Sequence, residues 1–180
     1  MLVTYKQRFP VFASRDRQII RSFAATMSIQ THPINALCVY NPISRESRDI
    51  RLLLLQPGHF SDPILCDILE ASLDDDKVKY ETLSYVWGDS SITTKVSVDG
   101  KETPVTTNLA SALKYIRQEN VPLTLWVDAL CIDQSNMEEK THQVRLMGDI
   151  YRRCTRVYIW LGCEIDSYLD FRPHDITDGK

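Results

Sequence analysis

The sequence lacks any segment that is long and apolar enough to cross a membrane as a helix. Its uninterrupted apolar runs, such as Leu52–Leu55, fall far short of the ~20 residues that a spanning helix needs. It also lacks an Asn-x-Ser/Thr acceptor and an excess of positive charge, since 24 Asp and Glu residues outnumber 21 Lys and Arg residues. These absences predict a cytoplasmic protein with no membrane span and no nucleic-acid partner.

Motifs for disulfides and metal sites are missing as well. The five cysteines are an odd number and form no C-x-x-C pair, so their spacing indicates neither a disulfide framework nor a zinc site. We therefore expect reduced, largely buried thiols and no bound metal.

The length and composition of the sequence suit one globular domain, and its charge is unevenly distributed. The 180 residues are 43% hydrophobic and 25% charged, which is ordinary globular usage. Residues 1–27 carry five basic residues and one acidic residue, a net charge of +4. In this region Ile19, Ile20 and Phe23 have helical spacing, which fits a surface helix or a targeting peptide. A start at Met27 is a further alternative.

Several short apolar segments have the pattern of β-strands. Each is rich in β-formers and ends at a turn signal or a polar loop. A further segment, 64–73, fits a strand or a helix. Asp99-Gly100 lies between two strand-like segments and predicts a type I′ hairpin. The expected strands are 51–55, 80–87, 95–98, 101–105, 123–127 and 157–161.

Two segments between these strands have the period of amphipathic helices. In the first, Leu109, Ala112, Leu113 and Ile116 form one apolar stripe, and the helix is expected to end near Asn120. The second has a Ser135/Glu138 capping box before its own stripe, which consists of Met137, Val144, Met147 and Tyr151.

The alternation of strands and helices from residue 80 to 161 predicts an α/β fold with a parallel sheet covered by helices. The hairpin and the strand at 51–55 are expected as additions at the edge of that sheet. Ligands of such sheets bind beyond the carboxyl ends of the strands, so the polar residues there are the candidate site. After the first strand these are Ser84, Tyr85, Trp87, Gly88 and Asp89, and after the second they are Asp128, Cys131, Asp133 and Gln134.

Each candidate also has a structural interpretation. Trp87 and Gly88 fit a packed indole and a tight turn, and Asp128 fits a cap of the next helix. Cys131 fits a buried thiol better than a nucleophile, because the nearest histidine, His142, lies on a helix with no third group to orient it. Glu138 suits a helix N-terminus, whereas Gln143 lies in mid-helix with an open role.

Long blocks of this sequence resemble the signature of the fungal heterokaryon incompatibility (HET) domain. The blocks are YETLSYVWGD, VTTNLASALKYIR, LWVDALCIDQSNMEEKTHQVRLMGDIYRRC and VYIWLG, in that order. The resemblance covers roughly residues 37–163 and implies a role in fungal non-self recognition and programmed cell death. It implies three regions: a basic N-terminal extension that is disordered or helical (1–36), the HET domain (37–163) and a polar tail (164–180).

The HET family is related at the level of the fold to TIR domains, so the resemblance implies a flavodoxin/TIR-like three-layer core. Some TIR domains cleave NAD with a glutamate at the start of the helix after the third strand. Glu164 is the positional match here, yet no helical pattern follows it. We therefore expect the third helix and later strands to be missing, which would leave a central strand exposed as an edge.

Two functions follow from the resemblance. The favoured one is a signalling module that associates with itself or with another HET- or NLR-type protein through Trp87, Trp160 and the sheet edge. The alternative is an NAD(P)-cleaving enzyme in which Glu164 stabilises charge, and an inactive truncated family member is a third option. No cofactor is firmly implied, and NAD belongs to the alternative only.

Overall fold

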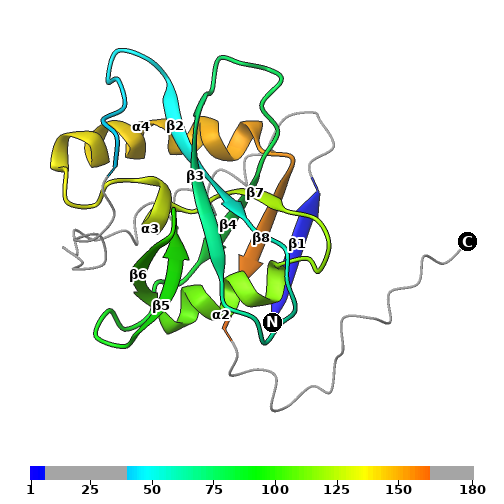
Figure 1. Ribbon diagram of the computed structural model, residues 1–180. Coiled ribbons are helices and arrows are strands. Elements are labelled where there is room, and N and C mark those ends of the chain that lie inside the picture. The colour runs from blue at the N-terminus through cyan, green and yellow to red at the C-terminus, as the bar shows by residue number, and fades with distance from the viewer. Residues whose placement is uncertain (7–39, 163–180) are drawn as a thin grey trace, which may run out of the picture.

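One mixed eight-stranded sheet organises the part of the chain that the computed structural model describes, residues 1–6 and 40–162 (Figure 1). Its strand order is β1-β8-β4-β7-β2-β3-β5-β6. The strands are β1 (Leu2–Lys6), β2 (Asp49–Leu55), β3 (Leu65–Ser72), β4 (Glu81–Tyr85), β5 (Thr93–Val98), β6 (Lys101–Thr106), β7 (Leu123–Trp126) and β8 (Arg156–Trp160). The helices are α2 (Thr107–Ile116), α3 (Asp128–Cys131) and α4 (Met137–Arg153).

The centre of the sheet contains a parallel unit of three strands. β4 pairs in parallel with β7 on one side and with β8 on the other. The connections β4-α2-β7 and β7-α4-β8 are therefore the crossovers that the sequence predicted, and the α/β class is confirmed. The sheet as a whole is mixed and not parallel, because four of its seven strand pairings are antiparallel, and only one of these four, the hairpin pairing of β5 with β6, was expected.

The position of β2 is a second correction. It lies inside the sheet, antiparallel to both β7 and β3, and not at the edge. Its run of buried residues from Ile50 to Leu53 explains this position, because an almost continuous apolar strand is stable only where both faces are covered. The ambiguous segment 64–73 forms its partner β3.

α2 and α4 cover opposite faces of the sheet. The strand register places Trp126 on the same face as Thr82, and Trp160 on the same face as Tyr85. Because Thr82 and Tyr85 are three residues apart on one strand, these faces are opposite. Trp126 packs against Tyr151 of α4, whereas Trp160 packs against Tyr115 of α2.

The hairpin between β5 and β6 confirms the Asp-Gly prediction and lies at one edge of the sheet, as expected. Asp99 and Gly100 both have positive φ, 50° and 73°, as a type I′ turn requires. The Asp99 carboxylate also accepts from the backbone N–H of Ile68 over 2.9 Å, which ties the turn to β3.

The ends of the helices differ in detail from the prediction. α2 ends at Ile116, before the expected Asn120. α4 is capped by Asn136, whose side chain accepts from the N–H of Glu139, and not by Ser135. The backbone N–H and hydroxyl of Ser135 instead both donate to Asp133, so this serine is already occupied in the preceding loop.

β1 corrects two expectations about the N-terminal region. Residues 2–6 were placed in a disordered or helical extension, but they form a strand antiparallel to β8. The pairing runs from Leu2 opposite Trp160 to Lys6 opposite Arg156, so the outer side of β8 is not an open edge. None of the helices in residues 1–6 and 40–162 has the length and apolar character of a membrane span.

Candidate functional site at the carboxyl ends of the parallel strands

The parallel strands β4, β7 and β8 bring their carboxyl ends to one side of the sheet, as the sequence predicted. Residues that follow β4 and β7 meet there. The indole Nε1–H of Trp87 donates to Oδ2 of Asp128 over 2.9 Å. Tyr85, at the end of β4, also hydrogen-bonds to Asp128 through its side chain.

Asp128 is the buried acid of this site. It is 8% exposed at the start of α3, and Oδ1 accepts from the N–H of Ala129 over 2.7 Å. Burial raises the pKa of its carboxyl from 3.8 to about 6, although the bonds from Trp87, Ala129 and Tyr85 act in the opposite direction. Burial also raises the pKa of the Tyr85 phenol well above its ordinary value. An acid of this kind changes its charge close to neutral pH.

Asn108 joins the ends of β4 and β8, a role that was not predicted from the sequence. Its amide donates to the carbonyl of Val86 over 2.5 Å, and its Oδ1 accepts from the indole Nε1–H of Trp160 over 2.8 Å. The N-terminus of α2 is capped by the side chain of Thr106, which accepts from the N–H of Leu109. Gly88 has φ of 76°, and a Cβ built there would lie 3.4 Å from Cβ of Asn108, which explains a glycine at this turn.

The loop after α3 contributes two more of the predicted residues, Asp133 and Gln134. Gln134 is 8% exposed, and its amide donates to the carbonyl of Asp128 over 2.9 Å. The N–H of Asp133 donates to Oε1 of Glu139 over 2.8 Å. Glu139 in turn forms a buried bidentate pair with Arg51, at 2.5 and 3.0 Å. Asp128 with Gln134 and Asp133 with Glu139 and Arg51 are thus two hydrogen-bonded groups, which the backbone of residues 128–134 joins into one network.

Arg51 and Glu139 were not among the predicted residues. Their side chains are 1% and 6% exposed, yet they lie 88 positions apart in the sequence. The guanidinium of Arg51 also donates to the carbonyls of Cys131 and Asn41. The only available signal was an arginine within the apolar run of β2, where an unpaired charge would be very unfavourable.

Other predicted residues lie apart from this network. Glu138 is exposed and pairs with Arg45. Gln143 is fully buried on α4, and its amide donates to the carbonyl of Asp49 over 2.9 Å. Asp89 accepts from Ser91 in its own exposed loop. Ser84 lies within hydrogen-bonding range of the Tyr151 side chain.

The geometry around Cys131 fits the buried thiol and not the nucleophile. The thiol is fully buried, and burial raises its pKa to about 12. The imidazole of His142 is engaged elsewhere, because its Nε2 lies 3.2 Å from the carbonyl oxygen of Ser47, just before β2. Glu164, the predicted catalytic residue, lies outside the described residues. The described part of the chain contains no group of three or more metal-ligating side chains.

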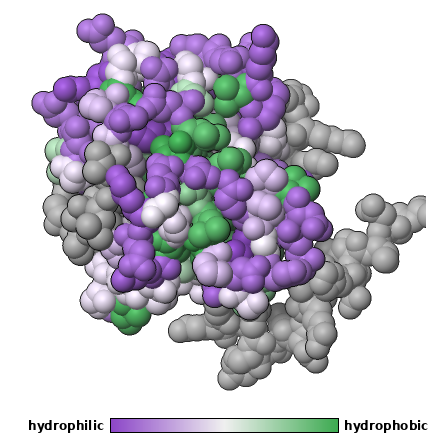
Figure 2. Space-filling model, viewed as in Figure 1, coloured by the Kyte–Doolittle hydropathy of each residue, from purple (hydrophilic) through white to green (hydrophobic). Residues whose placement is uncertain are grey.

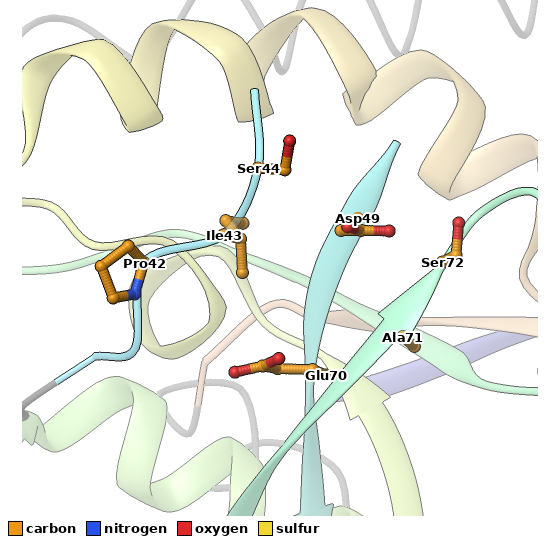
Figure 3. Close-up of a pocket in the computed structure, with 7 residues that line it drawn as sticks. All are labelled: Pro42, Ile43, Ser44, Asp49, Glu70, Ala71 and Ser72. Carbon is orange, nitrogen blue, oxygen red and sulfur yellow. The ribbon is translucent and has the colours of Figure 1, made fainter. Parts of the chain in front are cut away.

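A pocket of ≈ 330 Å³ lies beside this network, at the start of β2 and the end of β3 (Figure 3). Asp49 and Glu70 contribute carboxylates to it, and Ser44 and Ser72 contribute hydroxyls. Figure 3 shows the segment 42–44 on one side and the two strands on the other. The lining residues are Pro42, Ile43, Ser44, Asp49, Glu70, Ala71 and Ser72.

Two comparisons with known proteins decide the family. The family model described as "Heterokaryon incompatibility protein (HET)" matches residues 80–179, more than half of the chain. The chain belongs to the HET family. This confirms the resemblance of its signature blocks. The match begins just before β4 and continues past the last described residue, so it includes the parallel unit and its polar rim.

A fungal relative supports the same assignment. "Heterokaryon incompatibility protein 6, OR allele" from Neurospora crassa is 38% identical to this HET protein over 158 residues. The alignment covers 78% of this chain but only 23% of the relative, so the chain spans about a quarter of that protein. No solved structure matches the chain. The predicted boundaries of the HET domain, 37 and 163, stay predictions.

Proposed function

We propose that this HET domain acts in fungal non-self recognition and programmed cell death by assembling with a second copy or with another HET- or NLR-type signalling protein. Membership of the heterokaryon incompatibility family supports the biological process. The proposal concerns this domain, because the chain corresponds to 23% of the Neurospora relative.

The observation that carries the assembly proposal is the open outer side of β3. β5 pairs with β3 only at Leu65 and Cys66. Among the described residues, no strand continues this ladder along Leu69–Ser72. An open strand edge presents backbone donors and acceptors to which a strand of another chain can add.

The surroundings of this stretch favour a protein partner. Leu65 and Leu69 point to the same face of β3 and are 49% and 40% exposed. Figure 2, which shows one face of the molecule, has apolar side chains in its middle with hydrophilic residues around them. The pocket at Glu70 and Ser72 adjoins the open stretch and offers space for a side chain of the added strand.

The surfaces that the sequence suggested for assembly are less suitable. Trp160 is 1% exposed, so it cannot contact a partner, and the Trp87 indole is engaged with Asp128. The edge of β8 is paired with β1. At the opposite edge of the sheet, β6 contains Pro104, which has no N–H to donate.

The test replaces the two exposed leucines of β3 with positively charged lysines. In Leu65→Lys/Leu69→Lys the lysines oppose strand addition, so we expect light scattering to give the mass of one chain and expression in a fungal host to cause no growth arrest. Met137→Lys/Val144→Lys on α4 is the matched control and is expected to behave as wild type. Assembly and growth arrest by the β3 variant would contradict the proposal.

NAD cleavage is the second candidate, and one observation favours it. In the sheet, β4 lies between β7 and β8. The first strand of the parallel unit along the chain is therefore flanked by the second and the third, as in doubly wound folds of the flavodoxin and TIR type. The described rim residues, however, largely bind one another, as Trp87 does Asp128, so we derive no catalytic step. NAD consumption by the wild type that is lost in Glu164→Ala would favour this candidate over assembly alone.

A further inference from the structure

The pocket between residues 42–44 and the strands β2 and β3 combines negative charge with apolar lining (Figure 3). Asp49 and Glu70 contribute two carboxylates to it, and none of its lining residues is basic. Pro42, Ile43 and Ala71 add apolar surface. Arginine and lysine side chains have the matching shape, because a positively charged end follows an apolar stem.

The negative charge of the pocket is not neutralised by nearby basic residues. Arg51 lies opposite Glu70 on β2, but its guanidinium forms the buried pair with Glu139. Arg48 precedes Asp49 in the sequence and forms ion pairs with two acids outside the pocket. Among the described residues no third acid joins the two carboxylates. The pair therefore suits an organic cation better than Ca²⁺, which takes about six to eight oxygen ligands.

The backbone of Glu70 faces the open side of β3. The N–H of Ile68 donates to the Asp99 carboxylate on the side of β5. Because backbone groups alternate in direction along a strand, the N–H and C=O of Glu70 point to that same side. β5 pairs with β3 only at Leu65 and Cys66, so within the described part of the chain no strand is paired with these groups.

An antiparallel strand added here places one of its side chains beside the pocket. The residue that exchanges both backbone hydrogen bonds with Glu70 lies directly opposite it, with Cα atoms about 5.5 Å apart and side chains on the same face. The residues before and after it face the other side of the sheet, where the Leu69 side chain is 40% exposed. The matching strand therefore has a basic residue between two apolar ones.

We propose that this pocket binds an arginine side chain of the strand that adds to β3, at the position opposite Glu70. The inference rests on the strand addition proposed above and specifies its partner. Arginine suits the pocket better than lysine, because its planar guanidinium forms paired hydrogen bonds with carboxylates. Pairing of β3 with β3 of a second copy at Glu70 would bring two carboxylates together, which is unfavourable. The pocket therefore selects a strand of a different sequence.

A small arginine probe tests the pocket without requiring strand addition. The full chain is titrated with N-acetyl-arginine methylamide and its backbone amides are followed by NMR. We expect saturable shifts at residues 43, 44 and 70–72, and at least about tenfold weaker binding of the citrulline analogue, which keeps the shape but has no charge. Glu70→Gln should abolish the preference for arginine. Glu102→Gln, at an exposed position on β6 outside the pocket, is the matched control and should keep it.

Three results of this titration overturn the proposal. They are the absence of shifts at the pocket, equal binding of the two probes, and a preference for arginine that survives Glu70→Gln. Growth arrest in a fungal host then tests the use of the pocket by a partner. We expect Glu70→Gln to weaken growth arrest and Glu102→Gln to leave it unchanged. Full growth arrest by Glu70→Gln would overturn the role of the pocket in partner binding.

Failure of strand addition itself is distinguished by a variant that leaves the pocket intact. Leu65→Lys/Leu69→Lys changes no residue that lines the pocket, so it should bind the arginine probe as the wild type does. Probe binding together with growth arrest by this variant would contradict strand addition and leave the arginine pocket standing. Loss of probe binding in Glu70→Gln alone assigns the recognition of the guanidinium to the Glu70 carboxylate.

Discussion

The indole nitrogen of Trp87 donates to the carboxylate of Asp128 over 2.9 Å, and this bond joins the ends of two neighbouring parallel strands. Trp87→Phe keeps an aromatic ring but leaves one carboxylate oxygen of Asp128 without this donor. We expect the free energy of unfolding to fall by about 1–3 kcal/mol at pH 7. Urea denaturation measures the change.

A double-mutant cycle isolates this hydrogen bond from the loss of ring size. Trp87→Phe should cost clearly less in an Asp128→Ala background, because the acceptor is then absent. Equal costs in the two backgrounds would mean that the bond contributes nothing to stability.

The Asp128 carboxyl predicts a dependence of stability on pH. Its pKa in the folded protein is about 6, above its ordinary value of 3.8, so the folded state binds the proton more tightly than the unfolded state. The stabilisation from this group is therefore complete below about pH 4 and is lost as the pH rises through 6.

Comparison with Asp128→Asn separates this group from the other carboxylates. Between pH 4 and 7 the stability of the wild type relative to Asp128→Asn should fall by up to about 3 kcal/mol. Chemical denaturation at a series of pH values measures the difference, and a constant difference would contradict the assigned titration.

The buried pair of Arg51 and Glu139 predicts a large effect of removing one charge. Glu139→Met leaves the Arg51 guanidinium buried without its carboxylate, and we expect a loss of about 3–5 kcal/mol. Arg51→Met/Glu139→Met should recover part of that loss, because no unpaired buried charge remains. Denaturation midpoints check this order of stability, and a double variant less stable than both single variants would reverse it.

Two glycines predict opposite effects of the same substitution. Gly100 has φ of 73°, so Gly100→Ala should cost about 1–2 kcal/mol. Gly148 lies in α4, and an added Cβ there has no atom within 4 Å, so Gly148→Ala should stabilise by about 1 kcal/mol. Thermal unfolding distinguishes these outcomes, and equal shifts in both variants would contradict the argument.

Local sequence signals predicted the local structure well. Asp99-Gly100 specifies a hairpin through its backbone conformation alone, and the stripe of Leu109 and Leu113 specifies a helix through its period. The position of β2 could not be predicted in this way, because a buried strand fits several places in a sheet and the choice depends on distant neighbours.

The candidate site shows the same division between local and distant signals. Asp128 was predicted from its place after a strand, and the structure puts it at the rim with Trp87. The pairing of Arg51 with Glu139 joins residues 88 positions apart, and the sequence contains no local sign of it. β1 was missed because five residues beside a basic segment become a strand only through pairing with β8.

The pairing of β1 with β8 has a mechanical consequence. The strands are antiparallel, and the amino group of Met1 donates to the carbonyl of Gly162 over 2.6 Å. The start of β1 and the end of β8 therefore lie side by side. A force applied to residues 1 and 162 opens the ladder one rung at a time instead of shearing all rungs at once. Opposed traction on Met1 and on the chain beyond Gly162 would peel away β1 first, at low load, while the β4-β7-β8 unit stays intact.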